Sequence, residues 1–272
     1  MYKLFDLHND YFLKLKSKNK KEGYVSKCKP DAENIITALW TSELSNDESI
    51  REIERARDFV CNIPHLFLGV EDLHFLSKKN LEKFVSLRPV YAGLTWNSAN
   101  CLAGGANESG KMTNFGKFAV KCLEQNNIKI DAAHLNEDSF MDLSKISSKP
   151  LFCSHTAFFG LQPHARNLKD YQIKMIVDSG GLVGLCLVAD FLTDNKKCDV
   201  KHIVAHIDYF ACKFGVNNIA IGTDFFGTKH LPKQAKNYKE LVKNVSNLLS
   251  GMGYTEKSIS KIFYDNASEF FA

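Results

Sequence analysis

The sequence lacks the features that mark membrane-spanning and disulfide-rich proteins. No apolar stretch in its 272 residues reaches the roughly 20 residues that a membrane-spanning helix needs. Eight cysteines occur, but no two form a C-x-x-C pair, and several lie in apolar runs such as 182–188. We interpret them as reduced side chains that pack like small hydrophobes. Because no secretory signal opens the chain, this pattern predicts a cytoplasmic protein.

A strong net charge is also absent. The net charge is +4, and 24% of the residues are charged, which is ordinary for a soluble globular protein. The one concentration of charge is a series of lysines at positions 14, 16, 18, 20, 21, 27 and 29. Such a series can bind an anionic partner such as nucleic acid, or it can be a solvated loop. Because no aromatic stacking platform accompanies the lysines, we favour the loop and expect no nucleic-acid partner.

Three further patterns are missing. No G-x-G-x-x-G follows a predicted strand, which argues against an open dinucleotide-binding sheet. No G-x-S-x-G occurs, so a serine nucleophile is not expected, although Ser154 precedes His155. No Pro/Ser-rich linker or internal repeat divides the chain, so we expect residues 1–272 to form one domain. The Gly-, Asn- and Ser-rich segment 97–111 then reads as an active-site loop.

Short apolar runs alternate with amphipathic stretches along the chain. Helical spacing is clearest for Ile203, Ile207, Phe210 and Phe214, and it recurs for Leu241, Val245, Leu248 and Met252. A closing helical region is expected over 255–271. The predicted strands are 3–8, 34–40, 65–70, 90–96, 128–133, 151–154, 181–188 and 218–222. Eight strands alternating with helices predict a parallel sheet closed into a (β/α)8 TIM-type barrel.

Five of the predicted strands end in side chains that can bind metals or move protons. These are His8 and Asp10, Glu71, His134, His155 and Asp224. One such residue is weak evidence, but the carboxyl ends of the strands of a (β/α)8 barrel share one face, where the active site lies. The sequence therefore predicts a site on that face.

Five of these residues form a chemical set, namely His8, Asp10, Glu71, His134 and His155. Three imidazoles and two carboxylates exceed what an open single zinc site needs, but they suit two metal ions that share a bridging carboxylate. Two ions about 3.5–4 Å apart can hold a bridging hydroxide and polarise a carbonyl group. Asp224 could then accept the proton of the attacking water, or it could be a turn residue before Gly227.

A second histidine pair matches a metalloprotease motif only in part. His202 and His206 are four residues apart on a predicted helix, as in H-E-x-x-H metalloproteases. Ile203 stands where that motif has its glutamate, so the general base is missing. We therefore interpret these two histidines as packing residues.

Several short blocks resemble the membrane (renal) dipeptidase family of binuclear zinc peptidases, a branch of the amidohydrolase-like barrels. Their order and spacing match nearly from end to end of the chain, although each block alone is a weak signal. The blocks are 6–10 (DLHND), 68–71 (LGVE), 130–134 (IDAAH), 152–155 (FCSH), 165–167 (ARN), 222–225 (GTDF) and 265–267 (DNA).

The resemblance implies roles for these residues. His8 and Asp10 would bind one Zn²⁺, His134 and His155 the other, and Glu71 would bridge the two ions. Asp224 matches the acid/base aspartate of the family. Arg166 matches the arginine that binds the C-terminal carboxylate of a dipeptide, a role that suits a planar guanidinium. The resemblance also implies a homodimer and a compact microbial member of the family.

The chain departs from the family beside the expected site. Trp96 follows Leu94-Thr95, where animal members carry a histidine, and Asp72 follows Glu71, where a glycine is usual. We expect Trp96 and Asn97, with Arg166, to contact the substrate. These departures leave three functions open: a zinc dipeptidase, another amidohydrolase acting on N-acyl amino acids or lactams, and a barrel that binds a ligand without catalysis.

Overall fold

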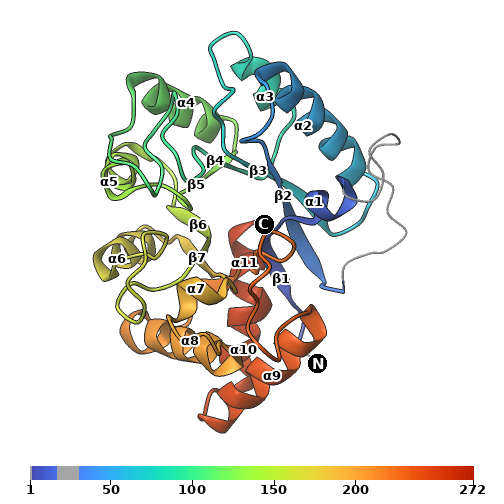
Figure 1. Cartoon of the computed structure of the whole chain (residues 1–272), viewed down its shortest axis with the longest axis vertical. Helices are drawn as coiled ribbons and strands as arrows, with labels where there is room; N and C mark the ends of the chain where they lie inside the picture. The colour runs from blue at the N-terminus through green and yellow to red at the C-terminus, as the bar shows by residue number, and fades with distance from the viewer. Residues whose placement is uncertain (1, 17–30) are drawn as a thin grey trace. The chain divides into compact units, whose positions relative to one another are not determined.

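The computed structural model describes residues 2–16 and 31–272. Its eight strands alternate with helices along the chain (Figure 1). The strands are β1 Phe5–Asn9, β2 Asn34–Trp40, β3 Leu66–Glu71, β4 Tyr91–Gly93, β5 Lys129–Asp131, β6 Phe152–Thr156, β7 Leu182–Leu185 and β8 Ile219–Ile221. They close into a barrel in the order β1-β2-β3-β4-β5-β6-β7-β8, which confirms the predicted (β/α)8 class.

All eight predicted strands occur, and β2 has the predicted bounds. The largest errors are at β4 and β7, which are several residues shorter than the apolar runs 90–96 and 181–188. The reason is that an apolar run continues past the last strand pairing and into the buried start of the following loop. Leu94, Leu187 and Thr95 are all buried beyond the ends of their strands.

The helices lie mainly between the strands. They are α1 Tyr11–Lys16, α2 Asn46–Val60, α3 Leu81–Ser86, α4 Asn114–Gln125, α5 Glu137–Ile146, α6 Asp170–Asp178, α7 Ala189–Leu192, α8 Val200–Phe214, α9 Tyr238–Gly251, α10 Glu256–Ser260 and α11 Asn266–Phe270, with a π-helical turn η1 at Lys261–Asp265. Local sequence explains several starts. Ser45 caps α2 in a reciprocal pair with Glu48, which satisfies backbone N–H groups at the start of the helix.

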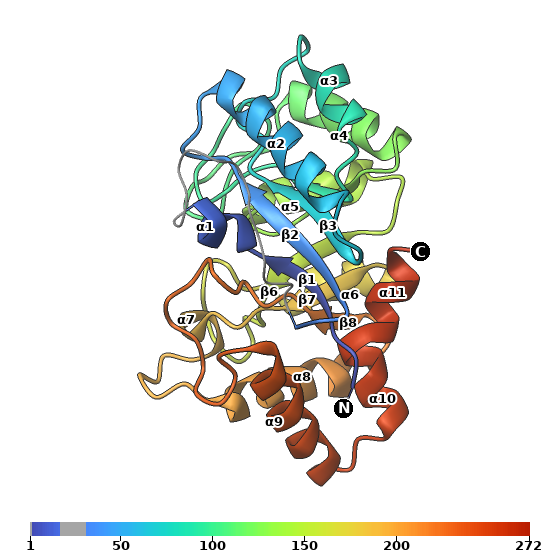
Figure 2. The ribbon, with the colours of Figure 1, turned by 90° about the vertical axis from the view of Figure 1, so that its right-hand side faces the viewer.

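Contacts group the described residues into two compact units, each considered by itself. Unit 1 comprises 2–9, 31–35 and 153–272. Within it β1 pairs with β8, and β8 pairs with β7, all in parallel. The closing helical region predicted over 255–271 occurs as α10, η1 and α11, which follow one another along one line (Figure 2).

The apolar faces of the unit 1 helices largely match their predicted spacing. Ile203, Ile207 and Phe210 of α8 are buried. In α9 the prediction was partly wrong, because Leu249 is buried where Leu248 was expected, and Met252 lies beyond the helix end and is exposed. The buried residues Leu241, Val245 and Leu249 follow one another at intervals of four, which places them on one face of the helix.

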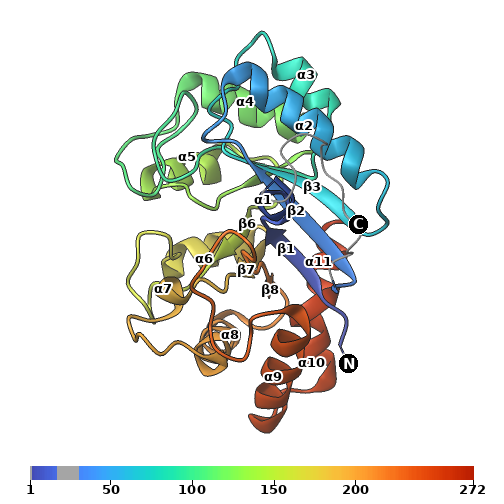
Figure 3. The same ribbon diagram turned by 45° about the vertical axis from the view of Figure 1, so that its right-hand side comes forward.

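Unit 2 comprises 10–16 and 36–152 of the described residues. Its strands β3, β4 and β5 pair in parallel, with Glu71 opposite Gly93 and Gly93 opposite Asp131. Helices α2, α3 and α4 gather on the same side of β3 (Figure 3). Gly69 makes room for the buried ring of Tyr91, because a Cβ atom at Gly69 would lie 2.5 Å from that ring.

The structure describes most of the cysteines and only part of the lysine series. Cys153, Cys186 and Cys198 are buried free thiols as expected, whereas Cys61, Cys101 and Cys212 are exposed. Of the lysine series, positions 18, 20, 21, 27 and 29 lie outside the described residues, as does Cys28. Assignment of 1–272 to one domain and a cytoplasmic location stay predictions.

Among the helices described, none combines the length and the apolar character that crossing a membrane requires.

Candidate metal centre

Two predicted ligands of unit 1 pack against each other. His8 of β1 and His155 of β6 are both buried, and their ring centroids are 3.8 Å apart with an interplanar angle of 35°. A ligand nitrogen of His8 lies within 4.8 Å of one from His155. Two buried imidazolium ions would repel each other at this separation, whereas two neutral imidazoles can share a cation. The pair therefore has the chemistry of a metal site.

Ser154 sets which nitrogen of each ring can bind. Its Oγ lies 2.7 Å from Nδ1 of His155 and 3.4 Å from Nδ1 of His8. A hydroxyl oxygen has two lone pairs, so it can accept an N–H from both rings. In that arrangement each Nε2 keeps its lone pair, which is the form that binds a metal. No local pattern in the sequence indicates this contact of Ser154.

The backbone around Ser154 is fixed by two glycines. A Cβ atom at Gly184 would lie 1.8 Å from the carbonyl oxygen of Ser154, and one at Gly222 would lie 1.9 Å from it. Only glycine therefore lets β7 and the residue after β8 approach β6 this closely. This close packing holds the segment that carries Ser154 and His155.

Asp224 follows β8 and lies beside His8. Its backbone N–H donates to the carbonyl oxygen of His8 over 2.9 Å, and a carboxylate oxygen lies within 4.8 Å of a His8 ring nitrogen. The residue is partly buried and has a φ of 57°, in the left-handed region. Its carbonyl also accepts from the N–H of Gly227, so the turn interpretation is correct for the backbone.

Asp6 is a buried carboxylate that sequence analysis did not single out. It accepts hydrogen bonds from the Thr223 N–H at 2.8 Å, the Thr223 hydroxyl at 2.7 Å and the Tyr238 hydroxyl at 2.7 Å. Burial raises the pKa of Asp6 to about 6, and these bonds oppose that rise. Burial also raises the pKa of Tyr238, so its phenol stays protonated and donates. Asp6 thereby fixes Thr223, the residue before Asp224.

In unit 2 the predicted bridging residue meets a predicted ligand. Glu71, the last residue of β3, has Oε1 2.8 Å from Nε2 of His134, and both side chains are buried. Nδ1 of His134 lies 2.8 Å from Oδ1 of Asn97. With the amide oxygen of Asn97 facing the ring, Nδ1–H donates, and the Nε2 lone pair faces the carboxylate. Two lone pairs at 2.8 Å repel unless a proton or a cation lies between the groups, so this pair also fits a metal ion.

Asp10 follows β1 directly and precedes α1. Its side chain is buried, and its carbonyl oxygen accepts the N–H of Leu13 in the first turn after the strand. A buried carboxylate at the end of a strand is consistent with the predicted ligand role.

Asp72, which directly follows Glu71, occupies a left-handed backbone conformation. Its φ is 68°, a region that glycine enters freely and that aspartate tolerates better than most residues. Its carboxylate accepts hydrogen bonds from Ser42 Oγ at 2.6 Å, Asn100 Nδ2 at 2.9 Å and the His74 N–H at 3.1 Å. Asp72 therefore ties together the loops that follow β2, β3 and β4.

His134, Asp72 and Asp224 all adopt left-handed backbone conformations at strand ends. Such conformations cost free energy for residues with a side chain, and they concentrate at functional sites.

Arg166 lies on the loop after β6 and is buried. Its Nη2 donates to the carbonyl oxygen of His155 over 3.2 Å, and its Nε is buried with no hydrogen-bond partner among the described residues. The guanidinium carbon lies 5.6 Å from the ring centroid of Phe191. Burial and the nearby arginine lower the pKa of His164, whose Nδ1 accepts a hydrogen bond from the backbone N–H of Arg166. The cation therefore keeps unused hydrogen-bonding capacity.

The predicted packing role of the helical histidines is confirmed for His206. Nδ1 accepts the N–H of Phe158 over 3.2 Å, and Nε2 lies 3.0 Å from the carbonyl oxygen of Leu192. Burial lowers the pKa of His206 to about 4. Its partner His202 contacts the helix cap Asp199 through Nδ1.

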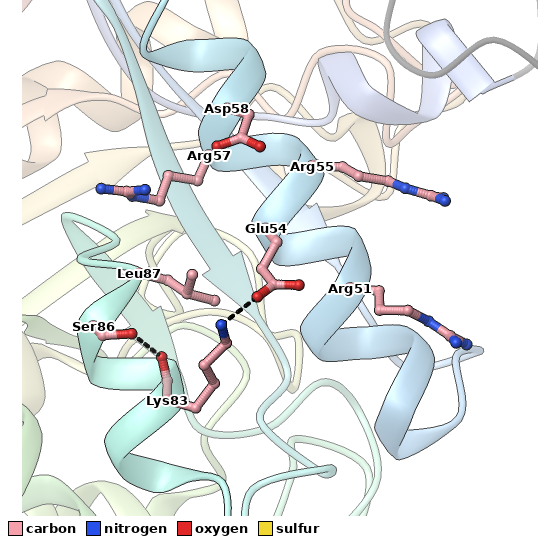
Figure 4. Close-up of a pocket in the computed structure, with 8 residues that line it drawn as sticks. All are labelled: Arg51, Glu54, Arg55, Arg57, Asp58, Lys83, Ser86 and Leu87. Carbon is pink, nitrogen blue, oxygen red and sulfur yellow. Dashed lines mark hydrogen bonds and ion pairs between the residues drawn. The ribbon is translucent and has the colours of Figure 1, made fainter.

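One surface pocket, of about 440 Å³, lies elsewhere, along α2 and α3 of unit 2. Figure 4 shows Lys83 of α3 reaching Glu54 of α2, an ion pair of 2.5 Å. The lining residues are Arg51, Glu54, Arg55, Arg57, Asp58, Lys83, Ser86 and Leu87. None of the predicted site residues lines this pocket.

Comparison with known proteins places the chain in a family. The family described as membrane dipeptidase (peptidase family M19) matches residues 34–271. An uncharacterized protein in the pqqA 5′ region of Klebsiella pneumoniae is 30% identical over 200 residues, which cover 69% of this chain and 73% of the relative.

Solved structures agree in fold. A metallo peptidase from Rhodobacter sphaeroides, liganded with a phosphinate mimic of the dipeptide L-Ala-D-Ala, superimposes with a TM-score of 0.88 at 18% identity, covering 99% of this chain and 98% of the other. The probable dipeptidase PvdM from Pseudomonas aeruginosa gives 0.85 at 17% identity, covering 99% and 94%. The comparisons favour peptide-bond hydrolysis over the amidohydrolase and non-catalytic alternatives. The chain belongs to the membrane dipeptidase family, peptidase family M19, and is a metal-dependent dipeptidase.

Proposed function

We propose that the chain hydrolyses dipeptides with two Zn²⁺ ions held by His8, Asp10, Glu71, His134 and His155. The observation that carries the proposal is the His8–His155 pair, two buried imidazoles 3.8 Å apart whose Nδ1 atoms share one serine hydroxyl. The Glu71–His134 pair supplies the same donor chemistry in unit 2. In unit 1 the strands β7, β8 and β1 pair in parallel, and in unit 2 the strands β3, β4 and β5 do. Parallel strands carry their carboxyl ends on one face, where barrel enzymes keep their ligands.

The metal ions would lower the pKa of a water molecule and polarise the peptide carbonyl group. Asp224 takes the proton that this water loses on attack and delivers it to the nitrogen of the leaving amine. Water and the peptide bond thus give one carboxylate and one amine. The hydrogen bond from the Asp224 N–H to His8, and the bonds of Thr223 to Asp6, hold the carboxylate for this transfer.

Arg166 would bind the C-terminal carboxylate of the substrate. Its buried guanidinium uses one Nη2 donor on a backbone carbonyl and retains Nε, which has no partner among the described residues. A buried cation with unused donors gains most from a carboxylate, which accepts two parallel hydrogen bonds. This clamp favours short peptides, because only a free carboxylate near the scissile bond can reach it.

Asn97, which the sequence suggested as a substrate contact, acts in this proposal mainly through His134. Its amide oxygen holds Nδ1–H of the ring and so presents Nε2 for binding. Family resemblance further suggests a homodimer, which light scattering tests directly.

Metal analysis with a dipeptidase assay tests the proposal. Protein produced with zinc in the medium should contain about two zinc ions per chain. A chelator should abolish hydrolysis of dipeptides such as Ala-Ala, and added zinc should restore it. The double variant H8A/H155A should lose metal, whereas the control K174A, at an exposed ion pair, should not. Protein that carries no zinc after this growth, or that keeps full activity without metal, contradicts the proposal.

A further inference from the structure

Both tryptophans of the chain meet beside a predicted metal ligand. The sequence contains two tryptophans, Trp40 at the end of β2 and Trp96 after β4. Their ring centroids are 5.2 Å apart at an interplanar angle of 64°, and the Trp96 centroid lies 6.0 Å from that of His134. We call these three rings, Trp40, Trp96 and His134, the aromatic corner.

Trp96 is exposed although the packing around it is tight. The residue is 37% exposed, while the neighbouring Leu94 and Thr95 are fully buried. Leaving much of an indole in water forgoes the free energy that burial of its apolar surface would give. An exposed indole beside a buried ligand histidine therefore suits a binding surface better than a packing role.

The segment that carries Trp96 is held on both sides. The hydroxyl of Thr95 donates to the carbonyl oxygen of His134 over 3.3 Å. A Cβ atom at Gly105 would lie 2.5 Å from the carbonyl oxygen of Trp96, so the loop backbone packs directly against this glycine. The N–H of Asn107 donates to the carbonyl of Asn97 over 2.9 Å. A ligand that contacts this indole pays little entropy to order it.

We propose that the aromatic corner binds the side chain of the N-terminal residue of the dipeptide and selects large apolar side chains there. This inference rests on the proposed function. The attacked carbonyl belongs to the N-terminal residue, so the side chain of that residue is carried next to the ligand His134. Arg166 is assigned to the carboxylate of the other residue. The indole face and edge offer apolar area and no charge, which suits leucine or phenylalanine better than glycine.

Kinetics on matched dipeptides test the inference. The wild-type enzyme should hydrolyse Leu-Ala and Phe-Ala with a kcat/KM about 10–100-fold above that for Gly-Ala. W96A, and W96H as a second variant, should reduce this ratio to about threefold or less. The ratio of Ala-Leu to Ala-Gly, which reports on the C-terminal residue, should stay unchanged. F118A, which removes an exposed ring on α4 of the same unit, is the control and should keep both ratios.

Fluorescence gives a second readout that needs no turnover. Because both tryptophans belong to the corner, the intrinsic emission of the whole chain reports on it. A phosphinate mimic of Leu-Ala should shift the emission of the zinc-loaded protein, and a mimic of Gly-Ala should shift it less. In the W40F variant Trp96 is the only tryptophan that emits, so the Leu-Ala mimic should still shift the emission.

The outcomes separate this inference from the proposed function. A wild-type enzyme that hydrolyses none of these dipeptides overturns the proposed function and the inference with it. An active enzyme without preference for Leu-Ala, or a W96A variant that keeps the preference with normal zinc content, overturns the inference alone. The inference is also overturned if W96A changes only the preference at the C-terminal residue. It is likewise overturned if the Leu-Ala mimic leaves the tryptophan emission unaltered.

Discussion

The hydroxyl oxygen of Ser154 lies 2.7 Å from Nδ1 of His155, its neighbour in β6. The same oxygen lies 3.4 Å from Nδ1 of His8, which is 146 residues away in the sequence. One small side chain thereby contacts two predicted ligands and sets the nitrogen through which each can bind. The contact depends on the close approach of Gly184 and Gly222 to the Ser154 carbonyl.

S154A should weaken zinc binding about 10–100-fold, because both imidazoles lose the group that fixes their tautomer and orientation. Competition with a chromogenic chelator measures the affinity. S246A, which removes a buried hydroxyl on α9, is the matched control. An affinity equal to that of the wild type would show that the hydroxyl does not orient the rings.

D224N should keep its zinc and lose about 10²–10⁴-fold in kcat for dipeptides, because the amide cannot accept the proton of the attacking water. Metal content and kcat are measured on the same preparation. D178N, at an exposed carboxylate on α6, should behave like the wild type. Turnover retained by D224N would remove the proposed proton transfer.

R166A should raise KM for Ala-Ala by about 10–100-fold, since a charge-assisted pair of hydrogen bonds is lost. The KM for alanyl-alanine amide, which has no carboxylate, should change far less. R166K should recover only part of the loss, because an ammonium cannot form the two parallel bonds. R55A, at an exposed arginine, is the control. Equal effects on the acid and the amide would contradict the clamp.

His206 should make the protein sensitive to acid. Burial lowers its pKa to about 4 from the usual 6.5, so the unfolded chain binds a proton between these values and the folded chain does not. The stability contributed is present above pH 6.5 and falls as the pH drops toward 4, by up to roughly 3 kcal/mol.

Urea unfolding of the wild type and H206Q at pH 4.5 and 7.5 measures this effect. The variant should lose less free energy of unfolding than the wild type between the two pH values, whatever its absolute stability. H230Q, at an exposed histidine, should follow the wild type. The same pH dependence in H206Q and the wild type would show that His206 does not cause the loss.

The local patterns of the sequence account for the strands and for the ligand candidates. An apolar run of five or six residues ending in His, Asp or Glu is a local signal, and His8, Glu71 and His155 belong to the strands themselves. Parallel strands place such ends on one face, so the position of the chemistry follows from the strand count and order. The lengths of the strands do not follow from these patterns, because pairing with neighbouring strands decides where a strand stops, as at β4.

What surrounds each ligand was decided by tertiary structure. Asp6 meets Tyr238 across 232 residues, and His134 meets Asn97 across 37. Side chains this far apart leave no periodicity in the sequence, and no local rule indicates which polar groups will be buried together. The sequence by itself determined the barrel and the set of groups that can bind metal. Tertiary packing alone decided which nitrogen of each imidazole is held by a hydrogen bond, and that the two tryptophans lie together beside His134.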